Sequence, residues 1–198
     1  MAAVTDGPLL TKLDALEADL RRLGRVVVAF SGGADSAFLA AVAHRTLGAA
    51  GAHAVTAVSP SLAGDEEDDC RALADEWGLR WTPVITHEME RAAYRLNDTD
   101  RCFHCKAELM DAVGPLAAAE GATVVLGVNL DDLGDHRPGQ KAAAEAGAEF
   151  PLVAAGFTKA DVRAASQHLG LRTWDKPAMA CLASRIPYGT RVSVGLLS

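Results

Sequence analysis

The stretch Val26-Val27-Val28-Ala29-Phe30-Ser31-Gly32-Gly33-Ala34-Asp35-Ser36 joins an apolar run to two glycines and then to an apolar helical segment. A strand that turns through glycines into a helix N-terminus is a ready anion site, because backbone N–H groups converge there and the helix dipole favours negative charge. The spacing is Ser-Gly-Gly-x-Asp-Ser, which matches neither G-x-x-x-x-G-K-[ST] nor G-x-G-x-x-G. The stretch therefore predicts a phosphate-binding loop, and the plainer alternative is an ordinary glycine turn.

Apolar patterns on both sides of this loop alternate between strand and helix. Apolar steps of three and four residues predict helices over 9–23, 65–77 and 158–169, another around 109–116, and a buried, all-round apolar helix over 37–47. Short apolar or β-branched runs predict strands over 26–30, 53–58, 80–85 and 123–128, with Pro83 placing the third at an edge. The predicted fold class is α/β: a doubly wound, mostly parallel sheet with helices on both faces.

The overall composition is that of a folded globular chain. Its 198 residues are 49% hydrophobic and 23% charged, so one domain with a real core is expected. The net charge of −7 argues against a nucleic-acid partner, because phosphate backbones are bound mainly through Lys and Arg. No apolar run reaches about 18 residues and no secretory leader is visible, so we predict a cytoplasmic protein without membrane contact. A small-molecule substrate fits this profile.

Polar residues follow several of the predicted strands at the edge where doubly wound sheets bind ligands. Ser59 follows the second strand, and the segment 127–132 with Arg137 follows the fourth. We expect these residues to face a nucleotide or substrate, and their alternative role is loop capping. The acidic run 65–69 is better explained as a helix start that matches the dipole than as a metal site.

The four cysteines are predicted to be thiols or metal ligands, because the chain shows no secretory leader. Cys70 shares a helix face with Leu73 and is expected to be a core thiol. Cys102 and Cys105 form a C-x-x-C pair, and Cys181 lies far along the chain. Spacing alone leaves a metal site and three unlinked thiols both open.

Several motifs occur in a fixed order and together resemble one family. They are Ser31 to Ser36, Arg101-Cys102-Phe103-His104-Cys105-Lys106, Gly127-Val128-Asn129-Leu130-Asp131-Asp132, Arg137-Pro138-Gly139, Trp174-Asp175-Lys176-Pro177, and the run from Cys181 to Gly189. This set is similar to the LarE family of ATP-dependent sacrificial sulfur transferases, which build the nickel-pincer cofactor of lactate racemase. The family belongs to the PP-loop ATP pyrophosphatases, whose fold is adenine nucleotide alpha hydrolase-like.

The resemblance implies a two-stage reaction on a pyridinium dicarboxylate mononucleotide. Magnesium-bound ATP adenylates a substrate carboxylate, pyrophosphate leaves, and a sulfur atom then displaces AMP. The catalytic residues implied are Cys181, Asp35, Arg185 and Lys106. The nucleotide-binding residues implied are Ser31, Gly32, Gly33, Asp35, Ser36, Ser59, Gly127, Asn129, Asp131, Asp132, Arg137 and Lys176.

The three cysteines Cys102, Cys105 and Cys181 match a branch of the family that ligates an iron–sulfur cluster. Such a 4Fe–4S cluster, held by three cysteines instead of four, would leave one iron open for exogenous sulfide. The other possibilities are zinc, with His104, His136 or His168 as a fourth ligand, and a lone sacrificial Cys181.

The resemblance also implies a domain organisation. Residues 1–189 are expected to form the PP-loop domain, and 190–198 to begin a C-terminal domain that is cut short and that supports a homo-oligomer in the full-length form. Two other functions stay open. One is a different adenylating enzyme, such as a tRNA thiolase or an amidating ligase, and the other is a nucleotide-binding protein without turnover.

Overall fold

A parallel sheet forms the centre of the molecule, and the predicted α/β architecture is confirmed. A computed structural model describes residues 7–134, 138–178 and 181–197. In this part of the chain the sheet has the strand order β3-β2-β1-β4, and every pairing is parallel. The strands are β1 (Val26–Ala29), β2 (Ala52–Val58), β3 (Arg80–Ile85) and β4 (Thr123–Leu126). Pro83 lies in β3 at the edge, as expected of a residue that cannot donate to the ladder.

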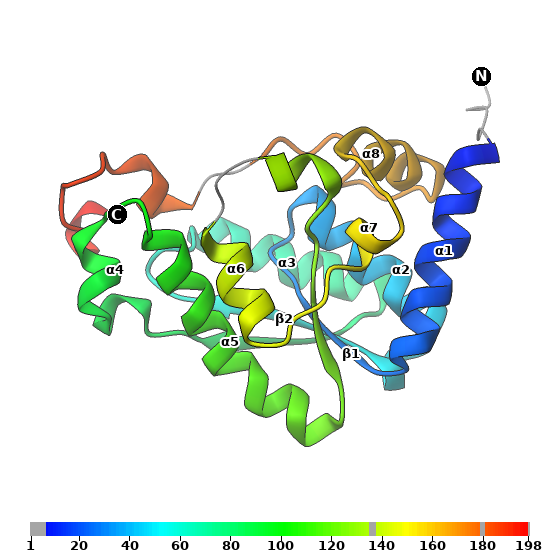
Figure 1. Cartoon of the computed structure of the whole chain (residues 1–198), viewed down its shortest axis with the longest axis horizontal. Coiled ribbons are helices and arrows are strands. Elements are labelled where there is room, and N and C mark those ends of the chain that lie inside the picture. The colour runs from blue at the N-terminus through cyan, green and yellow to red at the C-terminus, as the bar shows by residue number, and fades with distance from the viewer. Residues whose placement is uncertain (1–6, 135–137, 179–180, 198) are drawn as a thin grey trace.

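Helices cover both faces of the sheet (Figure 1). Because alternate side chains of a strand point to opposite faces, Val26 and Val28 belong to one apolar core and Val27 to the other. The first face is covered by α1 (Gly7–Leu23), α2 (Ala34–Gly51), α3 (Gly64–Trp77), α7 (Pro151–Ala154) and α8 (Lys159–His168). The second face is covered by α5 (Arg101–Glu120) and α6 (Pro138–Glu145).

Three predicted helices agree closely with the structure, and two differ. Helices predicted over 9–23, 65–77 and 158–169 correspond to α1, α3 and α8. The buried helix expected over 37–47 begins at Ala34, inside the glycine motif, and ends at Gly51 after a break at Gly48. The helix expected around 109–116 begins at Arg101, so the C-x-x-C pair lies in the first turns of α5.

A third apolar cluster holds the C-terminal segment against the start of α5. Tyr94, in α4 (Ala92–Leu96), packs with Ala183, Ile186, Val192 and Leu197. Figure 1 shows this segment beside α4, at the end of the molecule opposite α1. Short 3-10 turns complete the chain: η1 (Glu88–Glu90), η2 (Leu130–Gly134), η3 (Leu182–Arg185) and η4 (Val194–Leu196). Among the described helices, none has the length and apolarity that a bilayer crossing needs.

Candidate active site

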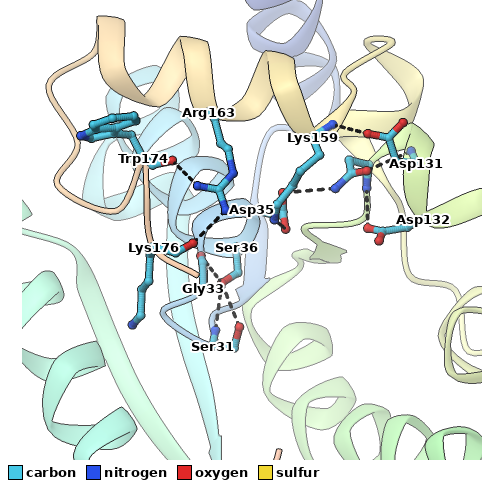
Figure 2. A network of polar contacts seen from close by, with 11 residues as sticks. Ser31, Gly33, Asp35, Ser36, Asp131, Asp132, Lys159, Arg163, Trp174 and Lys176 are labelled. Carbon is cyan, nitrogen blue, oxygen red and sulfur yellow. Dashed lines mark hydrogen bonds and ion pairs between the residues drawn. The ribbon is translucent and has the colours of Figure 1, made fainter. Parts of the chain in front are cut away.

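The glycine motif forms a compact loop between β1 and α2. The Ser36 hydroxyl donates to the carbonyl of Gly33 at 3.2 Å and accepts from the backbone N–H of Ser31 at 3.2 Å, and the two serine hydroxyls lie 3.1 Å apart (Figure 2). Gly32 has a φ of +71°, and a Cβ there would lie 2.9 Å from the Cys70 sulfur. Position 32 therefore requires glycine, because residues with a Cβ rarely adopt this positive φ. Gly33 has an ordinary φ of −70°, and a Cβ there would meet only the Ser31 hydroxyl at 3.5 Å.

The turn after β4 lies against the first turn of α2. A Cβ at Gly127 would lie 2.7 Å from the backbone nitrogen of Ser36, so this glycine allows the two backbones to touch. The Asn129 amide then donates to the Asp35 carboxylate at 3.2 Å. The structure thus brings together two predicted motifs that lie far apart in the sequence.

The acidic residues after Asn129 serve as loop caps in the described structure. Asp132 accepts a hydrogen bond from the backbone N–H of Asn129 at 3.1 Å, and Asp131 accepts one from the backbone N–H of Lys159 at 2.8 Å. This is the alternative that the sequence left open, and a nucleotide contact stays a prediction for both. Arg137, the remaining residue of this set, lies outside the described residues.

Lys159 is the residue of this site that sequence reasoning missed. Its ammonium forms an ion pair with Asp35, and it is the first residue of α8 (Figure 2). The apolar spacing predicted only a helix over 158–169, and the structure shows that Thr158 and Asp161 form a capping box at its start. A lysine in the first turn opposes the helix dipole, which was a signal that it serves another purpose.

Lys176 lies on the other side of the loop. A Cβ on Gly32 would be 3.6 Å from its ammonium, which forms an ion pair with Asp69 of α3. Arg163 donates to the carbonyls of Trp174 at 2.9 Å and of Lys176 at 3.0 Å, so α8 fixes the segment that carries this lysine (Figure 2). Two lysines from separate elements therefore flank the glycine loop, as a polyanion would require.

A second group of reactive side chains lies past the ends of β2 and β3. Glu88 is only 3% exposed and accepts a hydrogen bond from Ser59. Both line a pocket of about 130 Å³ that also contains Cys105, Lys106 and Cys181. Burial raises the pKa of Cys105 to about 11, although the charge of Lys106 acts in the opposite direction. Glu88 is the second residue that the sequence analysis did not identify.

The remaining cysteines, and the histidines considered as zinc ligands, lie in different surroundings. Cys102 is exposed, whereas Cys70 is fully buried and burial raises its pKa to about 11, which confirms its prediction as a core thiol. His104 pairs with Asp100 at 3.1 Å, and His136 lies outside the described residues. Across residues 7–134, 138–178 and 181–197, no three His, Cys, Asp or Glu side chains are grouped as a metal would need.

The residues around Cys181 are held by α4 and α5. Arg101 donates to the carbonyl of Ala183 at 2.8 Å and to the hydroxyl of Ser184 at 3.1 Å. The Ser184 hydroxyl also lies 3.0 Å from the sulfur of Cys181. Arg185, predicted to be catalytic, is exposed at the end of η3.

Comparisons with known proteins identify one matching family model and two similar proteins. The NAD synthase family model matches residues 13–109. The chain is 38% identical to the pyridinium-3,5-bisthiocarboxylic acid mononucleotide synthase of Lactiplantibacillus plantarum over 186 residues, which are 93% of this chain and 67% of that protein. It is 46% identical to an uncharacterized protein of Synechocystis over 187 residues, which are 94% of this chain and 69% of that protein.

Solved structures show the same fold at low identity. The NH3-dependent NAD synthetase of Campylobacter jejuni is 18% identical with a TM-score of 0.64, over 83% of this chain and 73% of that one. The NMN synthetase of Francisella tularensis is also 18% identical, with a TM-score of 0.66, over 86% of this chain and 74% of that one. At this identity the likeness supports the fold alone.

Proposed function

Because the chain belongs to the family of the pyridinium-3,5-bisthiocarboxylic acid mononucleotide synthases, the LarE family indicated by its motifs, we propose that it adenylates a carboxylate of a pyridinium dicarboxylate mononucleotide and converts it to a thiocarboxylate. The protein is thus an ATP-dependent sulfur transferase that forms AMP. The observation that carries this proposal is that a phosphate loop and a thiol pocket lie past the carboxyl ends of neighbouring strands of one sheet.

The first stage uses the loop between β1 and α2. Its backbone N–H groups, the hydroxyls of Ser31 and Ser36, and the ammonium groups of Lys159 and Lys176 provide donors and positive charge for the pyrophosphate of ATP. Asp35 offers the carboxylate that magnesium prefers, and Asn129 orients it. A carboxylate oxygen of the substrate attacks the α-phosphorus, and the bond to pyrophosphate breaks with its electron pair leaving on pyrophosphate. The product is an acyl adenylate.

The second stage uses the pocket that contains Cys181. A sulfur atom forms a bond to the acyl carbon, and the C–O bond to AMP breaks with its electron pair leaving on AMP. Lys106 lines the same pocket as Cys181 and supplies positive charge for the oxygen that becomes negative during the attack. Arg185 is proposed to contact the substrate from η3, and Ser59 is proposed to contact the nucleotide from the end of β2.

We also propose that Cys102, Cys105 and Cys181 ligate a 4Fe–4S cluster. The thiols fit this group chemically, Cys105 and Cys181 already line one pocket, and Cys102 precedes Cys105 by three positions in a helix, which puts both on one side of it. The exposed side chain of Cys102 would have to turn toward that pocket. The cluster would supply an iron at which exogenous sulfide is held.

A direct test supplies anaerobic protein with Mg–ATP, the pyridinium dicarboxylate mononucleotide and sulfide. We expect release of pyrophosphate and AMP, and a product in which sulfur has replaced oxygen, detected by mass spectrometry. Pyrophosphate release with another acceptor, such as a tRNA or an amine donor, would instead identify a different adenylating enzyme. Tight AMP binding without pyrophosphate release would identify a nucleotide-binding protein.

The cluster has its own test. After anaerobic purification, iron and sulfide analysis should find both elements in the wild-type protein and in Cys70→Ser, and should find neither in the Cys102→Ser, Cys105→Ser and Cys181→Ser variants. Iron-free protein that still transfers sulfur would contradict the cluster and leave Cys181 as a sacrificial donor. A cytoplasmic location, a homo-oligomeric full-length form and the absence of a nucleic-acid partner stay predictions from the sequence.

A further inference from the structure

Arg101, the first residue of α5, buries its positive charge among neutral groups. Arg101 as a whole residue is only 4% exposed. Its guanidinium donates to the amide oxygen of Asn97 at 2.5 Å, to the carbonyl of Ala183 and to the hydroxyl of Ser184, and it lies 5.5 Å from the ring centre of Tyr188. Within the described part of the chain, no carboxylate pairs with it. A buried charge without a counterion is costly, which indicates a purpose beyond packing.

Asn97 makes this arrangement rigid. It is fully buried with a φ of +56°, and its amide nitrogen donates to the carbonyls of Pro187 and Thr190, each at 2.8 Å. Those two bonds orient its amide oxygen toward Arg101. Together, Asn97 and Arg101 bind the backbone of the segment 183–190 at several points, so the residues that follow Cys181 are fixed to the start of α5.

The Ser184 hydroxyl connects Arg101 to the sulfur of Cys181. A guanidinium can only donate, so the Ser184 oxygen accepts from Arg101 at 3.1 Å. A hydroxyl carries one proton, and this proton is then available for the Cys181 sulfur, 3.0 Å away. The Ser184 oxygen keeps a second lone pair, so either atom can donate in this contact, and Arg101 and Ser184 together fix the position of the Cys181 sulfur.

We propose that Arg101 is a positioning residue that acts through Ser184 to fix the place of the Cys181 sulfur, and through it the place of the sulfur atom that attacks the acyl adenylate. This inference rests on the proposed function, in which Cys181 provides or holds the sulfur. Alignment of a nucleophile with its target carbon contributes to the attack that expels AMP, because the orientation is fixed before reaction. The glycine loop lies on other elements of the fold. Arg101 and Ser184 therefore serve sulfur transfer and not adenylation.

The test separates the two stages in the full chain. Single-turnover pyrophosphate release from Mg–ATP and the pyridinium substrate measures adenylation, and mass spectrometry of the product with sulfide present measures sulfur transfer. In Ser184→Ala we expect pyrophosphate release within about twofold of wild type and sulfur transfer reduced at least about tenfold, as for loss of an orienting contact. Ser184→Thr keeps the hydroxyl and should retain most of the transfer.

Two further variants complete the set. Arg101→Lys keeps the charge but not the planar fork, and should also lose transfer more than adenylation. Thr190→Ala is the matched control in the same segment, because only the backbone carbonyl of Thr190 contacts Asn97. Both stages should be unchanged in this control. Arg101→Lys carries the greatest risk of misfolding. The comparison of Ser184→Ala with Ser184→Thr therefore decides the outcome.

Two results would overturn the positioning role. One is wild-type sulfur transfer in Ser184→Ala, and the other is an equal loss of both stages together with a lowered melting temperature, which would show a purely structural contact. If wild type itself releases no pyrophosphate, the proposed function has failed. The positioning is then judged by iodoacetamide alkylation of Cys181 in metal-free protein, which Ser184→Ala should slow about threefold or more and Thr190→Ala should leave unchanged.

Discussion

Lys159 forms an ion pair with Asp35, the residue that we propose holds the magnesium of the nucleotide. In the proposed first stage, in which the Asp35 carboxylate holds magnesium, the ammonium of Lys159 would be freed beside the phosphates and would take a new anionic partner. Lys159→Met should therefore reduce pyrophosphate release by roughly 10- to 100-fold, the equivalent of one hydrogen bond to a charged group. Stopped-flow or coupled pyrophosphate assays measure this effect.

The control for Lys159 is another lysine that contacts the same helix. Lys12 pairs with Asp161 at 2.6 Å, away from the loop, so Lys12→Met should leave pyrophosphate release unchanged. Wild-type release in Lys159→Met would show that the ion pair only stabilises α8.

The two loop glycines should respond differently to substitution. Gly32→Ala forces an alanine to adopt a φ of +71° beside the Cys70 sulfur, which should lower the free energy of unfolding by about 1–2 kcal/mol. Gly33→Ala meets neither obstacle and should change stability by less than about 0.5 kcal/mol, yet still impair pyrophosphate release where the ligand approaches the backbone. Urea unfolding and the pyrophosphate assay measure the two effects, and equal destabilisation by both variants would contradict this distinction.

At the scale of single residues, the sequence identified those whose type is unusual for their surroundings. A double glycine and a remote cysteine in a motif are visible without coordinates. Glu88 and Lys159 were missed because their importance depends on burial and on partners elsewhere in the sequence. Lys159 meets Asp35 of α2, and Glu88, which follows β3, meets Ser59, which follows the neighbouring strand β2. Neither contact leaves a local pattern.

Among the elements, α8 contributes to the site through its N-terminus. The Thr158 hydroxyl accepts from the backbone N–H of Asp161 at 3.2 Å, and the Asp161 carboxylate accepts from the backbone N–H of Thr158 at 2.8 Å. Thr158→Ala should cost about 1 kcal/mol of stability. Because Lys159 is the next residue, we also expect weaker pyrophosphate release, whereas Thr158→Ser should preserve both properties. Denaturation and pyrophosphate release are measured on the same samples, and loss of stability alone would separate the cap from the site.

Element boundaries were less predictable than element types. Helix periodicity identified α1, α3 and α8, but the start of α5 was missed because Arg101 to Lys106 has no clear apolar period. This start is instead determined by tertiary contacts: Arg101 and Asn97 bind the C-terminal segment, and Tyr94 packs on it. Local propensity contains no information about these partners.

For the whole molecule, the fold followed from the sequence because strand–helix alternation with short connections leaves few arrangements open. The convergence of α2, α8 and the turn after β4 on one edge follows from the parallel sheet, and this explains why motifs far apart in sequence meet. The proposed start of a C-terminal domain at 190–198 stays a prediction, although Val192 and Leu197 pack on the cluster around Tyr94.

At the opposite end of the strands from the site, a polar cluster around the buried His53 joins β2, β3 and α5. His53 lies 2.9 Å from the Glu120 carboxylate and 2.8 Å from the Thr82 hydroxyl, and Arg80 donates to Glu120 at 2.6 Å. Burial by itself would raise the pKa of Glu120, but the hydrogen bonds from His53 and Arg80 outweigh it and hold the pKa below its ordinary value of 4.5. Folding therefore favours the ionised carboxylate.

This direction predicts how stability depends on pH. A carboxylate whose pKa is lower in the folded protein stabilises it fully above the unfolded pKa, and that stabilisation is lost as the pH falls through the lower folded pKa. Glu120→Gln should therefore reduce the free energy of unfolding by about 1–2 kcal/mol at pH 7, and its stability should converge on that of wild type as the pH falls through the lowered folded pKa of Glu120. Glu90→Gln is the control, because the Glu90 side chain is 80% exposed, and it should follow the wild-type curve throughout. Urea unfolding at a series of pH values measures all three proteins, and a constant difference between wild type and Glu120→Gln down to pH 3 would show that the loss reflects packing and not the charge of Glu120.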